Sequence, residues 1–247
     1  MSDNLFQHFS LTNLEVVDEI ASLQRRYESK YIIHQSRLIH LAAELQQSWL
    51  VLSMNDSQAF LYKTTYFDDD NLTSYRDHVK GRRHRYKIRV RTYSNDSSFL
   101  EVKQKTGRGE TKKFRRPRPT DHQDQISPQE QDWLGELITG IDQHSLHATL
   151  HLNYLRSTLV NPERGERLTI DQEIVMSNQK NSPLIAGATI IELKNQFPHS
   201  PTNRLLVRCG ARRLSVSKYC AGIALLNPDF HQGMIRTAQR LVGLEAD

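Results

Sequence analysis

The chain has 247 residues, 37% of them hydrophobic, and a formal net charge of +5. This length allows one domain with a substantial core, and two cysteines, Cys209 and Cys220, exclude a disulfide scaffold and indicate a reducing compartment. We find no apolar run of the roughly 20 residues that a membrane span needs and no signal peptide, so we expect a cytoplasmic protein.

The first third of the chain is predicted to mix helices and strands. Helical spacing of apolar residues covers 11–23, and alternation between the two faces predicts a strand at 25–33. The elements that follow are a helix at 36–47, strands at 49–54 and 59–67, and a short helix at 70–80.

Three strands joined by short polar turns come next. They cover 85–93, 99–105 and 110–116, and such a meander is antiparallel. The remaining predicted elements are a helix at 127–138, strands at 147–160, 167–175 and 188–194, and helices at 201–209 and 217–226. We therefore predict a single α+β domain over 1–247, built as a closed eight-stranded antiparallel β-barrel with flanking helices.

Basic residues are concentrated between 76 and 118, where few carboxylates oppose them. This indicates a polyanionic ligand: nucleic acid, a phospholipid surface or a phosphate chain. Lys87, Arg89 and Arg91 share one face of their strand, and the same alternation recurs at 28–30, 101–105, 111–115, 154–156, 167–173 and 192–194. Like charges on neighbouring strands repel each other, so we expect these faces to surround a lumen that a polyanion neutralises.

Carboxylates also lie on these charged faces. Glu192, with Glu28, Glu101 and Asp171, offers the oxygen ligands that Mg²⁺ or Mn²⁺ prefers. Each of these carboxylates could equally pair with a neighbouring Arg or Lys. Both interpretations remain open at the level of the sequence.

Seven short segments in this order resemble the VTC domain, the polyphosphate polymerase branch of the triphosphate tunnel metalloenzymes. The resemblance covers about 25–226 and rests on 28–30, 87–91, 99–103, 154–156, 167–171, 191–194 and 217–219. It implies a tunnel of eight antiparallel strands. It also implies transfer of the terminal phosphate of ATP to a growing polyphosphate chain, with release of ADP and a need for Mn²⁺ or a similar metal.

The resemblance, together with the charged strand faces, assigns roles to individual residues. Arg89, Arg91, Lys103 and Lys218 are the expected catalytic residues, and Glu192 is the expected metal ligand, with Glu28, Glu101 and Asp171 as further candidates. The expected phosphate-binding residues are Lys30, Lys87, Arg89, Arg91, Lys103, Lys105, Tyr154, Arg156, Arg167, Ser217 and Lys218.

Two positions depart from the patterns of the superfamily. Ser215 stands where the family's polymerases carry a further Lys, and Arg26 stands where other branches carry the first Glu of a Glu-x-Glu-x-Lys motif. The second departure argues against a small triphosphatase or a class-IV adenylyl cyclase. Any coupling to a membrane would require another protein.

Three functions are compatible with the sequence. The first is a metal-dependent polyphosphate polymerase, and the second is a non-catalytic tunnel that senses or holds polyphosphate for a partner. The third is a nucleic-acid-binding module built on 76–118. The few aromatic residues among its cations argue against it, because bases need stacking platforms.

Overall fold

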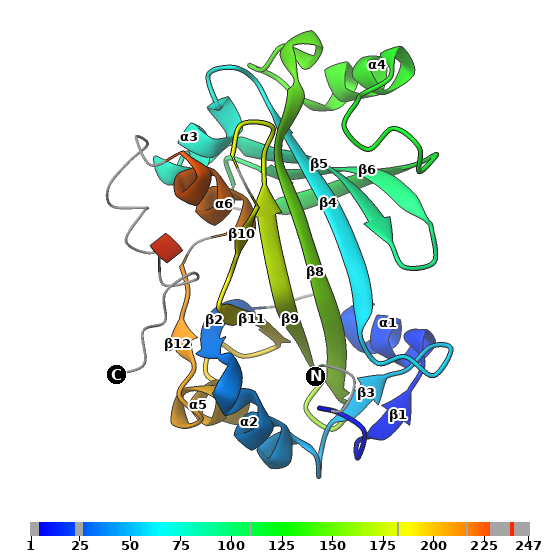
Figure 1. The fold of residues 1–247 in the computed structure, drawn as a ribbon, viewed down its shortest axis with the longest axis vertical. Helices are drawn as coiled ribbons and strands as arrows, with labels where there is room; N and C mark the ends of the chain where they lie inside the picture. Colours follow the sequence, from blue (N-terminus) through cyan, green and yellow to red (C-terminus); the bar gives the residue numbers. More distant parts are fainter. Residues whose placement is uncertain are drawn as a thin grey trace.

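A strongly curved sheet organises the protein in the computed structural model (Figure 1). The structure describes residues 5–22, 27–108, 110–181, 183–215, 217–227 and 238–239. The strands are β1 (Ser10–Thr12), β2 (Tyr27–His34), β3 (Leu50–Leu52), β4 (Phe60–Asp68), β5 (Arg85–Tyr93), β6 (Ser98–Lys105), β7 (Thr111–Arg118), β8 (His147–Asn161), β9 (Glu166–Ser177), β10 (Leu184–Ile185), β11 (Ala188–Asn195) and β12 (Arg212–Arg213).

Helices lie around this sheet. They are α1 (Leu14–Ser22), α2 (Leu38–Leu45), α3 (Thr73–Val79), α4 (Pro128–Leu137), α5 (Pro201–Arg208) and α6 (Lys218–Leu226), with 3₁₀ turns at Gln35–Arg37 and Gln143–Ser145. No helix in the described part of the chain combines the length and apolarity that crossing a membrane requires.

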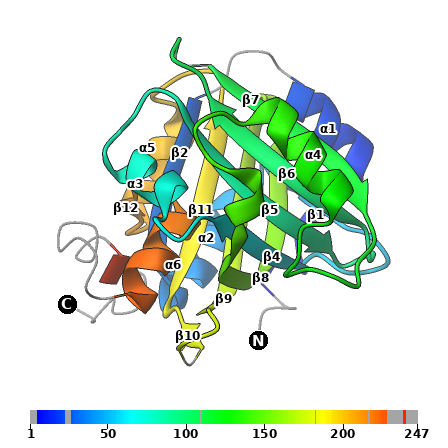
Figure 2. The ribbon, with the colours of Figure 1, turned by 90° about the horizontal axis from the view of Figure 1, so that it is seen from above.

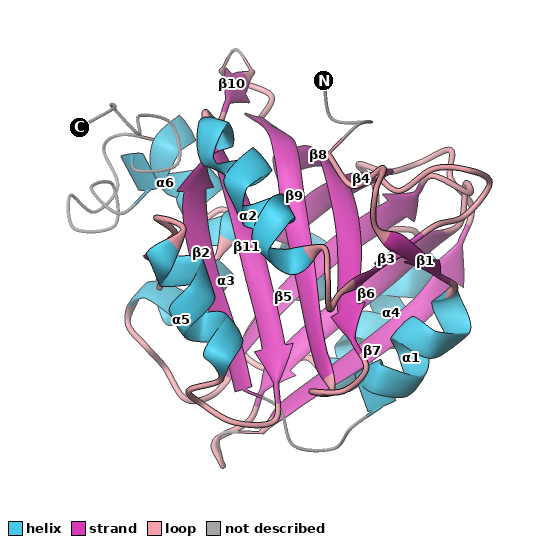
Figure 3. Ribbon diagram, turned by 90° about the horizontal axis from the view of Figure 1, so that it is seen from below, coloured by secondary structure: helices cyan, strands magenta, loops and turns pink. Residues whose placement is uncertain are grey.

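The outer face of the sheet is apolar and is covered by helices. On β5, Tyr86, Ile88 and Val90 are buried and pack with Leu134 of α4, which crosses β5 and β6 in Figure 2. Helices α2 and α5 cover β2 and β11 in the same way (Figure 3). The alternation of side chains along each strand therefore turns the charged residues between these apolar positions to the concave face.

Hydrogen bonds connect the main strands in the order β12-β2-β11-β9-β8-β4-β5-β6-β7. The predicted antiparallel pairing and flanking helices are confirmed, but the sheet has 12 strands, and no ladder joins β7 to β12 among the described residues. The expected closed eight-stranded barrel is therefore not observed. Strand β7 carries Lys112, Lys113, Arg115 and Pro117, and charged side chains and proline are typical of strands that stay unpaired at an edge.

Several predicted boundaries differ from the observed ones. Helix α1 begins at Leu14 rather than residue 11, because 10–12 pairs with β3. Helix α3 begins at Thr73 because Asp68 and Asp69 accept hydrogen bonds from the amides of its first turn. The short strands β1, β10 and β12 were not predicted, and residues 23, 25 and 26, at the edges of two predicted elements, lie outside the described residues.

Candidate functional site

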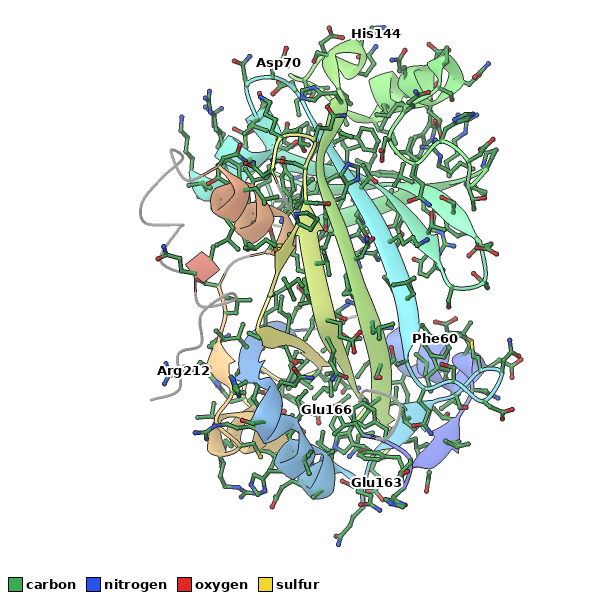
Figure 4. All side chains as sticks on the ribbon, viewed as in Figure 1. Phe60, Asp70, His144, Glu163, Glu166 and Arg212 are labelled. Carbon is green, nitrogen blue, oxygen red and sulfur yellow. The ribbon has the colours of Figure 1, made fainter. Side chains whose placement is uncertain are left out.

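A cavity of about 790 Å³ lies along the concave face of the sheet. Cationic side chains from both ends of the hydrogen-bonded strand order line it: Arg213 of β12, Lys30, Lys194, Arg167, Arg156, Lys87, Arg89, Arg91, Lys103, and Lys113 and Arg115 of β7. The curved sheet therefore surrounds the cavity although β7 and β12 do not pair in the part of the chain that the structure describes. In Figure 4, Glu163 and Glu166 mark the lower end of the sheet, at the β8–β9 turn, and Asp70 marks the upper end, near α3.

Strand register places these cations in rows across the cavity. Lys87 pairs with Lys103, which pairs with Lys113, so three lysines lie side by side on β5, β6 and β7. The next row consists of Arg89, Glu101 and Arg115. Neighbouring like charges repel each other. An external anion therefore stabilises the first row more than the second, because the second row already contains the carboxylate of Glu101.

Glu101 is held by two arginines. Its Oε2 lies 2.6 Å from Nη2 of Arg89 and 3.8 Å from Nη1 of Arg91. Burial would raise the pKa of the Glu101 carboxyl, but Arg89 and Arg91 more than offset burial and lower it. Glu101 therefore stays ionised and orients Arg89, whose Nη1 also donates to the hydroxyl of Tyr66 at 3.3 Å.

Asp171 lies beneath the cavity rather than in its lining. Its side chain is fully buried and accepts hydrogen bonds from Nε and Nη2 of Arg156 at 2.6 and 2.8 Å, while Nζ of Lys218 lies 2.5 Å from Oδ2. These two cations overcome the effect of burial and lower the pKa of Asp171. Asp171 thus positions Arg156 and Lys218, and its oxygens are already occupied by them.

Glu192 and Glu28 lie on either side of Lys30. Oε1 of Glu192 lies 2.8 Å from Nζ of Lys194, its Oε2 lies 3.8 Å from Nζ of Lys30, and Glu28 pairs with Lys30. Both carboxylates line the cavity. Within the described ranges, no three His, Cys, Asp or Glu side chains form a group that could hold a metal ion. Mg²⁺ is usually bound by only one or two carboxylates, together with phosphate oxygens and water.

Three lysines of the cavity, one each on β5, β6 and β7, lack such partners among the described residues. In the described part of the chain, no carboxylate lies within 4 Å of Lys87, Lys103 or Lys113. Burial is the largest cause that lowers the pKa of Lys30 and of Lys87 to about 8. Lys30 and Lys87 are therefore poorly solvated, and the cations of the lining are only partly neutralised, an environment that favours an anionic ligand.

Helix α6 lies beside the cavity, next to α3. Ser217 caps the helix by accepting a hydrogen bond from the amide of Cys220 at 3.2 Å, and both Ser217 and Lys218 line the cavity. The hydroxyl of Tyr219 donates to buried Asp68 at the end of β4 at 2.5 Å, and Asp68 also accepts from the amides of Ser74 and Tyr75 in α3. The positive end of α6 therefore faces the cavity, where it favours anions.

Aromatic side chains complete the lining, and sequence reasoning missed most of them. Tyr154, which was expected, stacks on Tyr62 with ring centroids 5.4 Å apart and has the cations of Arg156 and Lys218 over its ring, each 5.2 Å from the centroid. Tyr62, Tyr66 and His78 also line the cavity. The alternation of Tyr62, Thr64 and Tyr66 along one strand was the available signal for the two tyrosines.

The structure brings together most of the predicted site residues. Lys30, Lys87, Arg89, Arg91, Lys103, Tyr154, Arg156, Arg167, Ser217, Lys218, Glu28, Glu101 and Glu192 all line the cavity. Lys105 and Asp171 are not part of this lining. Ser215, where the family's polymerases carry a Lys, does line the cavity but adds no charge.

Comparison with known proteins gives a family and a set of similar folds. A family model described as the VTC domain matches residues 25–227. No curated protein matches the sequence.

Among solved structures, 19 chains match. One is a putative adenylyl cyclase, HpAC1 from Hippeastrum, described as having a dominant triphosphatase activity (TM-score 0.48, 16% identity, covering 80% of this chain and 94% of that chain). Another is the hypothetical protein NE1496 (TM-score 0.30, 12% identity, covering 72% of this chain and 80% of that chain).

Proposed function

The chain belongs to the VTC domain family, and from this premise we propose that it transfers the terminal phosphate of ATP to a polyphosphate chain inside the cationic cavity, with Mn²⁺ or Mg²⁺ as cofactor. The observation that carries the proposal is the lining of the cavity. Cations from both ends of the strand order converge on it, and the adjacent Lys87, Lys103 and Lys113 have no carboxylate within 4 Å among the described residues.

Phosphoryl transfer requires little from a protein beyond positioning and charge neutralisation. In the proposed reaction, the bond between the terminal phosphorus of ATP and its bridging oxygen breaks, and a terminal oxygen of the acceptor chain bonds to that phosphorus. ADP leaves with the bridging oxygen. Arg89, Arg91, Lys103 and Lys218 would bind the phosphate oxygens, since Arg binds two oxygens at once and Lys supplies a point charge.

Glu192, with Glu28 beside it, would hold the divalent metal. When bound, the metal neutralises charge between neighbouring phosphates. Glu192 is suited to this role because its pKa is held well below the ordinary value: burial would raise it, but Lys194, Lys30 and other cations outweigh burial. A carboxylate that stays ionised when buried can bind a metal at neutral pH.

A second candidate function is a tunnel that binds polyphosphate without turnover. Two observations favour it. Ser215 supplies no charge where the family's polymerases supply a Lys, and each of the four candidate metal carboxylates already has a cationic partner. This candidate differs from the first only in catalysis, so a measurement of turnover separates the two.

The test is incubation of the purified protein with ATP and Mn²⁺, followed by a gel that resolves polyphosphate and by an assay for ADP. Arg89→Ala and Lys103→Ala are run beside Lys63→Ala, a control that removes an exposed cation from the opposite face of β4. We expect a phosphate ladder with ADP release, lost in the first two variants and retained in the control. Binding of tripolyphosphate without product would support the non-catalytic tunnel, and absence of both would refute both functions.

A further inference from the structure

Ion pairs are unevenly distributed along the cavity. Arg89, Arg156 and Lys194 each lie within 2.8 Å of a carboxylate oxygen. At the α3 end, the row of Lys87, Lys103 and Lys113 has no carboxylate within 4 Å among the described residues. Arg115, Arg167 and Arg213 elsewhere in the lining also have no carboxylate within 4 Å among the described residues, but only at the α3 end do three such cations lie side by side on paired strands of the described chain.

The row of cations continues beyond the cavity. Arg85 pairs with Lys105 in the register of β5 and β6, two residues outward from the pair of Lys87 and Lys103. Because side chains alternate, Arg85 and Lys105 face the same side of the sheet, about 6.6 Å further along the strands. Both are half-buried, and neither belongs to the lining of the cavity.

These outer cations also lack counter-ions. No carboxylate lies within 4 Å of Arg85 or Lys105 in the part of the chain that the structure describes, and Arg85 donates one of its five N–H groups to the carbonyl of Arg82. The guanidinium of Arg85 contributes to lowering the pKa of Lys87, although burial is the largest cause. Two adjacent rows of like charge destabilise the sheet unless a ligand neutralises them.

The chemistry of the rows favours a phosphate chain over a nucleic acid. The positions on the concave face of β5, β6 and β7 at this end are Arg85, Lys87, Lys103, Lys105, Thr111 and Lys113. None of them is aromatic, whereas proteins that bind single strands stack bases on aromatic rings. A ligand that presents phosphates without bases fits these rows.

Building on the proposed function, we propose that Arg85 and Lys105 form an outer subsite for the part of a polyphosphate chain that extends from the cavity at its α3 end. The protein then binds a long polyphosphate more tightly than tripolyphosphate, because only the long chain reaches the outer row. Arg85 and Lys105 thus increase the affinity for long chains, whereas short chains are bound by the cavity alone.

The test compares the affinity of tripolyphosphate, a long-chain polyphosphate and a single-stranded oligonucleotide for the double variant Arg85→Ala/Lys105→Ala. The matched control is Lys63→Ala/Lys112→Ala, which removes the same charge from exposed positions on the other face of the sheet. We expect the outer-subsite variant to lose about tenfold in affinity for the long chain, which equals about 1.4 kcal/mol. Its affinity for tripolyphosphate should stay within about twofold of the wild type, which also shows that it is folded.

The outcomes separate this inference from the function on which it rests. If the outer-subsite variant and the control bind the long chain equally, the subsite is refuted while the cavity stands. If the wild type binds neither polyphosphate, the proposed function itself fails. If the oligonucleotide binds as tightly as long polyphosphate and loses the same affinity in the variant, the assignment of the subsite to polyphosphate is overturned.

Discussion

Replacement of Asp171 by Asn tests the ion-pair network beneath the cavity. The substitution keeps the size of the side chain but removes the charge that Arg156 and Lys218 share. Asp171 is fully buried, and breaking a buried pair from one side costs about 3–5 kcal/mol because the remaining charges stay uncompensated. For a domain of this size, each 1 kcal/mol shifts the melting temperature by about 2–4 °C, so we expect a decrease of about 6–20 °C.

The assay is thermal unfolding, with Asp132→Asn as the control. Asp132 is exposed on α4, where loss of a charge should change the free energy of unfolding by no more than about 0.5 kcal/mol. Tripolyphosphate should restore part of the loss in Asp171→Asn, because the ligand supplies negative charge to Arg156 and Lys218. A variant that melts within about 2 °C of the wild type would refute the reasoning.

The low pKa of Asp171 also predicts a dependence on pH. Its folded pKa is depressed below the unfolded value, so its contribution to stability is fully present above the unfolded pKa of about 3.9. The contribution is lost as the pH falls through the folded pKa. Wild type and Asp171→Asn should therefore differ most in melting temperature above about pH 4 and converge at lower pH.

Four further predictions concern the cavity and helix α6. Arg89→Ala should weaken tripolyphosphate about 10- to 100-fold by calorimetry, because a charge-assisted pair contributes about 1.5–3 kcal/mol; unchanged affinity would contradict the site. Lys30 and Lys87, with pKa values lowered from 10.5 to about 8, should make the protein more stable as the pH rises from 8 to 10, since the unfolded chain binds more protons there. Tripolyphosphate should draw in protons at pH 8, detected as a dependence of the binding heat on the buffer, and a heat independent of buffer would count against this. Gly222→Ala should destabilise by about 1–3 kcal/mol in denaturant, because the added Cβ would lie 2.6 Å from Cδ2 of Leu150, and a neutral effect would show that α6 can shift freely.

The sequence was sufficient to predict most elements and the side of the sheet that each charged residue faces. Short polar turns indicated the meander of β5, β6 and β7, and alternation placed Lys87, Arg89 and Arg91 together on one face. Both signals are local, since a turn depends on neighbouring residues and alternation depends on the pleat of a single strand. Predictions from local signals of this kind therefore agree with the folded structure.

The properties that were missed depend on how distant segments meet. Whether Asp171 binds a metal or pairs with a cation was open at the level of the sequence, because no pattern within one strand reveals that β8 places Arg156 directly opposite it. Lys105 faces the predicted side, but the lining of the cavity on β6 extends only to Lys103, and no pattern within the strand marks that limit. Closure of the sheet likewise depends on whether β7 meets β12, a strand of two residues that pairs with β2.

The most direct test of the central claim is a crystal structure of the protein with tripolyphosphate and Mn²⁺, in which anomalous scattering locates the metal. We expect the phosphate chain inside the cavity, in contact with Arg89, Lys103 and Lys218, and Mn²⁺ bound between the phosphates and Glu192. Tripolyphosphate bound only on the outer surface, with the cavity holding solvent, would contradict the claim that this cationic cavity is the functional site.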